Sequence, residues 1–525
     1  MMKKILLLGS CFFLSMMVRA QYNLSALIPM PNRIEVVQTK SFEVKTGKTA
    51  IVCSDKALQF EALQLQRIFH ERMGVDLPIV EAPAKHAVTL EIDRTLKGRE
   101  HYCLEVTPRG MTLKGATSAA VFWGLMTFEQ LLLGDVCATN GKQITAVKID
   151  DRPRFPHRAL MLDPARHFHS VDDIKFYIDQ MVRYKYNVLQ IHLTDDQGWR
   201  LEIKSHPNLA SRQHYSQEEM KTLIAYAAQR HIDIVPEIDV PGHTVGILSV
   251  YPELACRHLQ GSPVEVGKTV NRMVCAANPK TYEVLGDVIR EVCALFPSPY
   301  IHLGGDEAAV PGNWEKCPDC QNLMKSKGYT KATQLMIPFF DKVLAEVRLG
   351  GKKPILWCEL NNIYPPATDY LFPYPKDVTL VSWRNGLTPT CLQLTAENGH
   401  PIIMAPGEHA YLDYPQWKGD LPEFNNWGMP ITSLQQTYRL DPGYGRPDVE
   451  QSHVLGVMGT LWGEAICDIQ RANYMTYPRG LALAEAGWTQ MEHRSWESFK
   501  DRIYPNLMLL MKSGVSVRVP FEIAR

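Results

Sequence analysis

From residue 159 onward, short apolar runs alternate with longer segments in which apolar residues recur every three or four positions. Such runs predict buried parallel strands, and the segments between them predict amphipathic helices. Strand followed by helix, repeated about eight times, is typical of a (β/α)8 barrel. The expected strands cover residues 159–162, 188–193, 232–235, 300–303, 355–358, 379–382, 402–404 and 454–458. The expected helices cover residues 171–186, 217–230, 279–296, 332–348, 475–486 and 496–511.

Before this region the pattern predicts a smaller α/β domain of short strands and helices. It shows no concentration of titratable residues, so we expect a structural or docking role for it. The proline-rich segment Asp151-Arg-Pro-Arg-Phe-Pro156 reads as a linker. We therefore expect an N-terminal α/β domain at residues 21–151 and a barrel domain at residues 152–525. The strands include residues 49–53 and 87–92, and the helices include residues 57–73 and 116–133.

Residues 1–20 have the three parts of a secretory signal peptide. Lys3 and Lys4 precede an apolar run that ends in Val18-Arg19-Ala20. The run is short for a bilayer span, and no later stretch approaches about 18 uninterrupted apolar residues. We therefore expect export to the periplasm, cell surface or medium, without a transmembrane segment. The sequence Leu8-Gly-Ser-Cys11 leaves a lipid-anchored form open as an alternative.

Composition and charge exclude several classes of protein. Apolar residues make up 45% of the chain and charged residues 21%, as in ordinary globular proteins and unlike disordered chains or coiled coils. Basic and acidic residues are equal in number, 56 each, with no basic block. The electrostatic attraction that dominates nucleic-acid binding is therefore missing, and we expect a neutral ligand. For the assembly, a homodimer is one alternative.

We expect most of the cysteines to be buried thiols, because a chain of this size does not need a disulfide framework. Cys317-Pro-Asp-Cys320 is the exception. Two thiolates are half of a zinc site, and no second CxxC or HxxxH motif accompanies them. We therefore expect a local disulfide between Cys317 and Cys320 rather than a metal, while Cys256 and Cys275 flank a loop and are candidates for a second pair.

Carboxylates and aromatic residues follow nearly all of the expected barrel strands. The active site of such a barrel lies at the carboxyl ends of its strands, so these side chains should converge. Clustered carboxylates are suited to general acid and base catalysis at a glycosidic oxygen, and tryptophans are suited to stacking on a sugar ring. The sequence therefore predicts a glycosidase. The residues are Arg166, Asp195, Asp196, Glu237, Asp239, His243, Asp306, Glu307, Trp357, Glu359, Trp383, Tyr411, Asp413, Trp462 and Glu464.

The sharpest local feature is Gly304-Gly-Asp-Glu307, in which glycines permit a close backbone approach and adjacent acids point in different directions. With its neighbours, this motif resembles those of glycoside hydrolase family 20, the β-N-acetylhexosaminidases. The resemblance extends from Ala26-Leu-Ile-Pro-Met-Pro31 to the last helices. The other motifs are Leu162-Asp-Pro-Ala-Arg-His167, His192-Leu-Thr-Asp-Asp-Gln-Gly-Trp-Arg200, Val235-Pro-Glu-Ile-Asp-Val-Pro-Gly-His243, His302-Leu-Gly-Gly-Asp-Glu307, Tyr411-Leu-Asp413 and Leu461-Trp-Gly-Glu464.

The resemblance implies an exo-acting, retaining enzyme that removes terminal β-linked N-acetylglucosamine or N-acetylgalactosamine, with the substrate's acetamido group as nucleophile. Glu307 would be the acid and base. Asp306 and Tyr411 would orient the acetamido group and stabilise the oxazolinium intermediate. No cofactor or metal is expected. Arg166, Trp357, Trp383, Asp413, Trp462 and Glu464 would bind the sugar, with Asp195 and His243 supporting Glu307 from behind.

Four alternatives remain open on the sequence. Two stay close to the family: an enzyme that releases a disaccharide, and a non-catalytic glycan-binding protein. A third is a double-displacement glycosidase with Glu464 as its nucleophile. The fourth is a metal-dependent amidohydrolase, suggested by His167-Phe-His169 after the first barrel strand, although the later strands lack further metal ligands.

Overall fold

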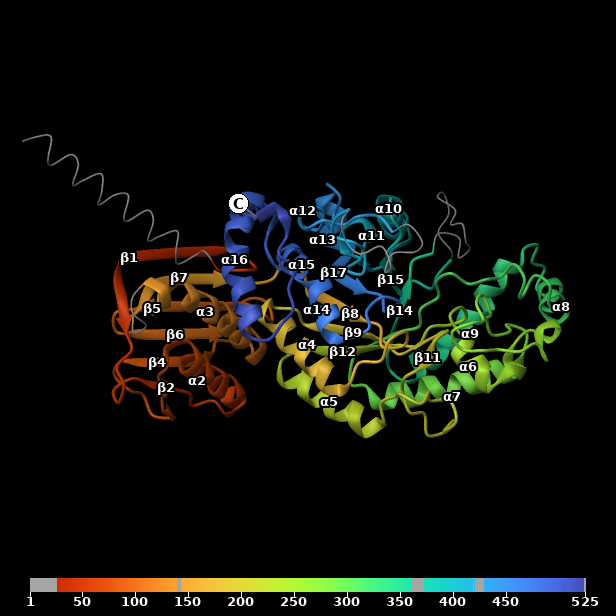
Figure 1. Ribbon diagram of the computed structural model, residues 1–525, viewed down its shortest axis with the longest axis horizontal. Coiled ribbons are helices and arrows are strands. Elements are labelled where there is room, and N and C mark those ends of the chain that lie inside the picture. Colours follow the sequence, from red (N-terminus) through yellow and green to blue (C-terminus); the bar gives the residue numbers. More distant parts are fainter. Residues whose placement is uncertain (1–25, 139–142, 360–372, 419, 421–428, 524–525) are drawn as a thin grey trace, which may run out of the picture.

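The computed structural model describes residues 26–138, 143–359, 373–418, 420 and 429–523, and the expected signal peptide lies outside them. A mixed sheet with two helices forms one end of the molecule, and a closed barrel surrounded by helices forms the rest (Figure 1). The predicted fold class, a (β/α)8 barrel preceded by a smaller α/β domain, is confirmed. Within the described ranges, no helix is both long and apolar enough to cross a membrane.

The N-terminal sheet has seven strands in the order β1-β7-β5-β6-β4-β2-β3. Its helices α2 (Gln59–Met73) and α3 (Ser118–Ala138) pack together and supply buried leucine, isoleucine and phenylalanine side chains to the core of this part. The strands are β1 (Arg33–Glu43), β2 (Ala50–Val52), β3 (Ile79–Val80), β4 (Ala87–Ile92), β5 (Tyr102–Thr107), β6 (Gly110–Gly115) and β7 (Gln143–Asp151).

The barrel consists of eight parallel strands in chain order, closed by pairing of the last strand with the first. Each predicted strand is present, with ends that differ by a few residues. The strands are β8 (His157–Leu162), β9 (Val188–His192), β12 (Asp233–Glu237), β13 (Tyr300–His302), β14 (Lys353–Trp357), β15 (Thr379–Ser382), β16 (Ile402–Met404) and β17 (Val454–Leu461). A two-residue hairpin, β10 (Thr194–Asp195) with β11 (Gly198–Trp199), follows β9.

Helices surround the barrel close to the predicted positions. Two predictions need correction: the helix expected from residue 332 begins as a 3-10 turn, Ala332–Leu335, and residues 475–486 belong to two helices. The helix is interrupted at Pro478, whose nitrogen cannot donate a helical hydrogen bond. The helices around the barrel include α4 (Val171–Arg183), α5 (Gln217–Gln229), α7 (Pro279–Leu295), α9 (Met336–Leu349), α10 (Thr388–Asn398), α14 (Ile469–Thr476), α15 (Arg479–Trp488) and α16 (Trp496–Lys512).

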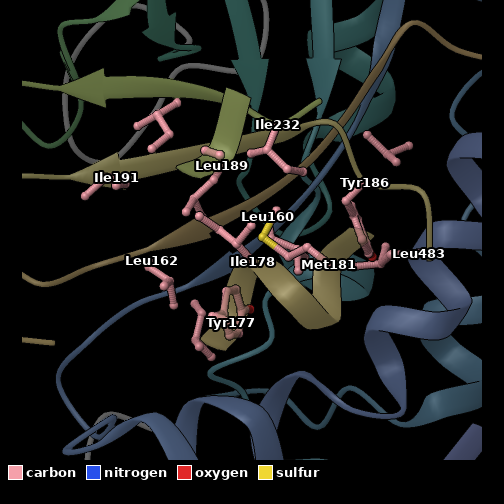
Figure 2. Close-up of a cluster of buried hydrophobic side chains, with 14 of the residues drawn as sticks. Leu160, Leu162, Tyr177, Ile178, Met181, Tyr186, Leu189, Ile191, Ile232 and Leu483 are labelled. Atoms are coloured by element: carbon pink, nitrogen blue, oxygen red, sulfur yellow. The ribbon is translucent and has the colours of Figure 1, made fainter. Parts of the chain in front are cut away.

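Alternation along the strands divides the buried side chains into two layers. Ala159 and Met161 of β8 point into the barrel, where they belong to a cluster with Trp357 and Met458. The alternate residues face outward. Figure 2 shows outward-facing Leu160 beside Met181 and Ile178 of α4. The barrel is therefore a filled core, and a ligand site can form only at its ends.

Candidate active site

A cavity of about 540 Å³ opens at the carboxyl ends of the barrel strands. Its walls come from segments that follow six of the eight strands, so the barrel itself brings these side chains together. Trp357 is not in the lining. It ends β14 beneath the cavity, where it is buried and its Nε1 donates a hydrogen bond to Glu237 Oε1 at 2.7 Å. The lining residues are Arg166, His243, Asp306, Glu307, Trp383, Arg384, Asn385, Leu387, Tyr411, Asp413, Tyr414, Met429, Trp462 and Glu464.

Asp306 and Glu307 sit in different surroundings although they are adjacent. The Asp306 side chain is 9% exposed, whereas that of Glu307 is 44% exposed. Glu307 has a φ of 46°, a conformation that side-chain-bearing residues adopt rarely and that is found at functional sites. This turn directs two neighbouring carboxylates to separate places, one inside the wall and one at the opening.

The turn before this pair depends on glycine. Gly304 has a φ of 64°, and a Cβ atom there would lie 1.7 Å from Asp239 Oδ1. The same Asp239 oxygen accepts a hydrogen bond from the Gly305 nitrogen at 3.0 Å. Asp239, two residues beyond the end of β12, therefore holds the backbone that carries Asp306 and Glu307.

A series of charged side chains, Asp195 and His243, connects Arg166 to the carboxylates of the catalytic pair. Arg166 Nη2 is 2.9 Å from Asp195 Oδ2, and Asp195 Oδ1 is 3.4 Å from His243 Nδ1. His243 Nε2 then lies 3.7 Å from both Asp306 Oδ2 and Glu307 Oε2. Burial alone would lower the pKa of His243, but Asp195, Asp306 and Asp239 outweigh it and raise that pKa well above its ordinary value. The imidazole is thus positively charged at neutral pH.

A second layer of polar groups lies below the cavity. Glu237 is buried between His192 Nδ1 at 3.0 Å and His302 Nδ1 at 3.3 Å. Burial would raise its pKa, but the two histidines lower it to about 2. His192 also contacts Asp195 Oδ2 at 2.9 Å. The histidines within β9 and β13 therefore support the wall from inside the barrel and do not line the cavity.

The opposite wall is the segment that carries Tyr411 and Asp413. It is tied to β17 through the Leu412 nitrogen, which donates to the Thr460 carbonyl at 2.7 Å. The buried Arg479 donates to the carbonyl of Tyr414 at 2.9 Å and to that of Thr432 at 3.0 Å. No local sequence pattern indicates this role, because Arg479 lies in a helix 65 residues after Tyr414.

Aromatic rings complete this wall. Trp383 stacks on Tyr411 with an interplanar angle of 13° and a centroid distance of 6.5 Å. The Trp462 ring lies 6.4 Å from Tyr411 and 5.6 Å from Trp357. Arg166 covers the Trp462 ring at 5.0 Å. The cavity thus combines flat apolar faces with charged groups, as a sugar-binding site requires.

Several buried polar atoms of the cavity have no hydrogen-bond partner among the described residues. They are Asp306 Oδ1, Tyr411 Oη, Asp413 Oδ1 and Trp383 Nε1. An unpaired buried polar group costs about 1–3 kcal/mol. Since four such atoms belong to one cavity, a ligand with several donors and acceptors would satisfy them together.

Two buried acids at the cavity take up protons near neutral pH. Burial and the neighbouring Glu464 raise the pKa of Asp413 to about 8. Burial also raises the pKa of Glu359 to about 8, although Arg384 at 2.9 Å opposes the shift. Glu359 was expected among the residues that follow the barrel strands, but it was given no role, and Arg384 was not predicted. Arg384 follows a strand as the predicted residues do, but its functional meaning depends on Glu359, 25 positions earlier.

The structure therefore brings most of the predicted residues to one place. Glu307, Asp306, Tyr411, Arg166, Trp383, Asp413, Trp462 and Glu464 line the cavity, while Asp195 and Trp357 lie behind it. His243, expected behind Glu307, also reaches the lining. Sequence reasoning missed Asn385, Leu387, Tyr414 and Met429, which come from loops and carry no motif.

Comparison with known proteins agrees with this arrangement. A family model for the catalytic domain of glycosyl hydrolase family 20 matches residues 155–491, and a model for domain 2 of that family matches residues 24–152. A β-hexosaminidase of Akkermansia muciniphila is 35% identical over 511 residues, covering 94% of this chain and 91% of that protein.

Solved structures show the same likeness. A crystal structure of a β-N-acetylhexosaminidase has a TM-score of 0.78 and 33% identity, covering 95% of this chain and 98% of that one. The exo-β-N-acetylglucosaminidase of Vibrio harveyi, solved in complex with N-acetylglucosamine, has a TM-score of 0.80 and 30% identity, covering 95% of this chain and 79% of that one.

A parallel barrel with carboxylates and stacked aromatic rings around one cavity defines a glycosidase. Together with the matches over nearly the whole chain, it shows that this chain belongs to glycosyl hydrolase family 20, with β-N-acetylhexosaminidase as its activity. The amidohydrolase alternative is thereby set aside.

Proposed function

We propose that this enzyme removes terminal β-linked N-acetylglucosamine or N-acetylgalactosamine with the residue roles given below. Family 20 is an exception to the rule that two enzyme carboxylates share glycoside hydrolysis, because the substrate's acetamido oxygen acts as nucleophile. The enzyme must then position that oxygen, protonate the leaving group and stabilise the cation that forms. Each task has a candidate group in the cavity.

Glu307 protonates the leaving glycosidic oxygen as the acetamido carbonyl oxygen attacks the anomeric carbon. Asp306 accepts a hydrogen bond from the acetamido N–H and stabilises the positive charge of the resulting oxazolinium ring. The Tyr411 hydroxyl, kept protonated because burial raises its pKa well above the ordinary value, donates to the carbonyl oxygen. Glu307 then removes a proton from water, which opens the ring with retention of configuration.

The remaining groups bind the sugar. Arg166, Asp413 and Glu464 line the cavity with groups that can bind ring hydroxyls, and Trp462 lines it with an aromatic ring on which a sugar can pack. A neutral sugar is favoured because the Glu464 carboxylate would repel an anionic group and the buried Asp413 is penalised when it ionises. His243 and Asp195 hold the catalytic pair in place without needing to touch substrate.

One observation carries this proposal: a buried Asp306 with an unpaired oxygen adjoins an exposed Glu307 at the opening of the same cavity. In a double-displacement enzyme a second carboxylate attacks the anomeric carbon directly. Glu464 is less suited to that role, because its Oε1 lies 3.2 Å from Arg166 Nε at the rim.

The test compares chromophore release from aryl N-acetyl-β-glucosaminide and N-acetyl-β-galactosaminide with release from the matching glucoside and galactoside. We expect turnover of the N-acetyl substrates only. Equal turnover of glucoside and N-acetylglucosaminide would refute acetamido participation. Silence on all four would point to the disaccharide-releasing or binding-only alternative.

Asp306→Asn tests the orienting role separately. We expect kcat on the N-acetyl substrate to fall by about 10²- to 10³-fold, as when one transition-state hydrogen bond in a preorganised site is removed. Asp341→Asn, at an exposed position on α9, is the matched control and should keep full activity. Near-normal activity of Asp306→Asn would remove the assigned role.

We also infer that the enzyme is exported, on the strength of the signal-like residues 1–20. Sequencing the amino terminus of the protein recovered from the periplasm or medium tests this. Cleavage after Ala20 is the expected result. An intact Met1 would contradict export, whereas a lipid on Cys11 would identify the lipid-anchored alternative.

A further inference from the structure

Four cysteines from two loops converge beside the active-site wall. Cys256 and Cys275 belong to the segment after α6 (Val245–Val250), and Cys317 and Cys320 lie at the start of α8 (Pro318–Ser326). The four sulfur atoms all lie within 4.8 Å of one another. Cys275 Sγ is 3.5 Å from Cys320 Sγ and 3.9 Å from Cys317 Sγ. None of the four side chains is more than 2% exposed.

The spacing of these sulfur atoms is that of ligands around one ion. A tetrahedral site with metal–sulfur bonds of about 2.3 Å places its sulfurs about 3.8 Å apart. A disulfide brings two sulfurs to about 2.05 Å and leaves other pairs unconstrained. All four cysteines are free thiols here, and each is close to the other three.

This arrangement changes the sequence-based expectation of a Cys317–Cys320 disulfide. That expectation rested on the absence of a second ligand motif. The second half is supplied by Cys256 and Cys275, which are too far apart in sequence to form a recognisable motif. The antiparallel bridge between Ala255 and Val274 brings their two segments together.

The surroundings favour thiolate. Cys317 is the N-cap of α8, where the helix dipole stabilises negative charge. A cation among the four buried sulfurs would compensate the negative charge of their thiolates.

We propose that Cys256, Cys275, Cys317 and Cys320 bind one Zn²⁺ ion as a closed structural site. Zinc is the expected metal because four thiolates in tetrahedral geometry match its preference. Each zinc–sulfur bond forms as a thiol gives its proton to solvent, with no change of oxidation state. Four protein ligands leave no open coordination position, so the site takes no part in the glycosidase reaction.

The ion would fasten two loops that meet next to the catalytic pair. Cys317 follows Glu307 by ten residues, and the segment between them already contacts the other loop. Trp314 Nε1 donates to the Val274 carbonyl at 2.8 Å, and Asn313 Nδ2 donates to the Asn271 carbonyl at 2.9 Å. Figure 1 shows α8 at the end of the molecule opposite the N-terminal sheet, away from the support of that sheet.

The first test is elemental analysis of the full chain, purified without chelators. We expect one zinc per chain. Replacement by Co²⁺ should give the sulfur-to-cobalt charge-transfer band and intense visible bands of a tetrahedral tetrathiolate. Non-reducing peptide mapping should find all four cysteines free of disulfides. These readouts do not depend on glycosidase activity, so they separate this proposal from the proposed function.

The double variant Cys317→Ser/Cys320→Ser should lose zinc and the cobalt spectrum and should melt at a lower temperature. Cys103→Ser and Cys467→Ser, which change thiols outside the cluster, are the matched controls and should keep the metal. If the double variant does not fold, the zinc content, cobalt spectrum and peptide map of the wild-type protein still test the proposal. Metal-free wild-type protein, a disulfide within the cluster, or iron in place of zinc would each overturn the proposal.

Discussion

At the scale of single residues, carboxyl groups that lie close together in the active site differ in exposure and in pKa because their surroundings differ. Asp306 is enclosed by the wall, while Glu307, the next residue, reaches the opening. Asp413 takes up a proton near neutral pH, whereas Glu237 below it stays charged between two histidines. Such differences separate acid, base and binding roles among residues of one chemical type.

Glu307→Gln should lower kcat by about 10²- to 10⁴-fold, the usual contribution of general acid–base catalysis. Binding should remain, because the amide keeps the shape of the side chain at the opening. Steady-state kinetics with the aryl N-acetylglucosaminide and calorimetric binding of N-acetylglucosamine measure the two effects. Glu315→Gln, an exposed position nearby, should be fully active. A variant at Glu307 with wild-type kcat would exclude it as the acid.

Asp413→Asn should stabilise the unliganded protein, with a gain that grows as the pH rises. Because the folded pKa of Asp413 is about 8, above the ordinary carboxyl value, its contribution to stability is fully present below about pH 4 and lost as the pH rises toward 8. The amide does not ionise and avoids that loss. One pKa unit corresponds to about 1.4 kcal/mol, which sets the scale of the difference.

Urea denaturation at several pH values measures this effect of Asp413→Asn. Asp172→Asn, whose side chain is 91% exposed, is the control and should show no such pH trend. A constant or shrinking difference between the Asp413 variant and wild type would show that the buried carboxylate is not penalised.

At the scale of elements, the barrel strands could be predicted because each is a short apolar run, and the site residues because they directly follow these runs. The wrong helix at residues 475–486 shows the limit of this reasoning. Its apolar spacing continues across Pro478, so the pattern hid the break between α14 and α15. The four-cysteine cluster and the support by Arg479 also escaped prediction, because they join segments whose proximity only the folded barrel creates.

Gly304→Ala should disrupt the junction between β13 and the catalytic pair. The new methyl group would meet Asp239 Oδ1 at 1.7 Å, and the positive φ adds about 1–2 kcal/mol. Overpacking typically costs a further 1–3 kcal/mol or so, for a total of about 2–5 kcal/mol. Activity should fall with stability, because Asp239 holds the turn.

Gly328→Ala is the matched control for that change. Gly328 has a similar φ of 70°, but nothing lies within 4 Å of the added Cβ atom. It should cost only the backbone strain and leave kcat unchanged. Equal losses in the two variants, measured by urea denaturation and steady-state kinetics, would mean that the contact with Asp239 is unimportant.

At the scale of the whole molecule, the N-terminal sheet is joined to the end of the barrel opposite the cavity. Asp151, at the end of β7, accepts hydrogen bonds from Tyr102 at 2.6 Å, Trp488 at 2.9 Å and Lys185 at 3.1 Å. Tyr102 belongs to the sheet, while Trp488 and Lys185 belong to the barrel. These contacts therefore stabilise the fold and take no part in catalysis, since the catalytic groups lie at the carboxyl ends of the strands.

Asp151→Ala should destabilise the protein by about 3–5 kcal/mol, because it leaves the buried ammonium group of Lys185 without its carboxylate partner. The kcat at 25 °C should stay close to that of wild type, since the cavity lies at the other end of the strands. Asp150→Ala is the control: this neighbouring side chain is 52% exposed and contacts His101 at 3.0 Å, so its removal should cost about 1 kcal/mol or less. Urea denaturation followed by both fluorescence and residual activity would compare the two. If Asp151→Ala were no less stable than Asp150→Ala, the sheet would be held to the barrel by its apolar contacts alone, and Asp151 would not couple their unfolding.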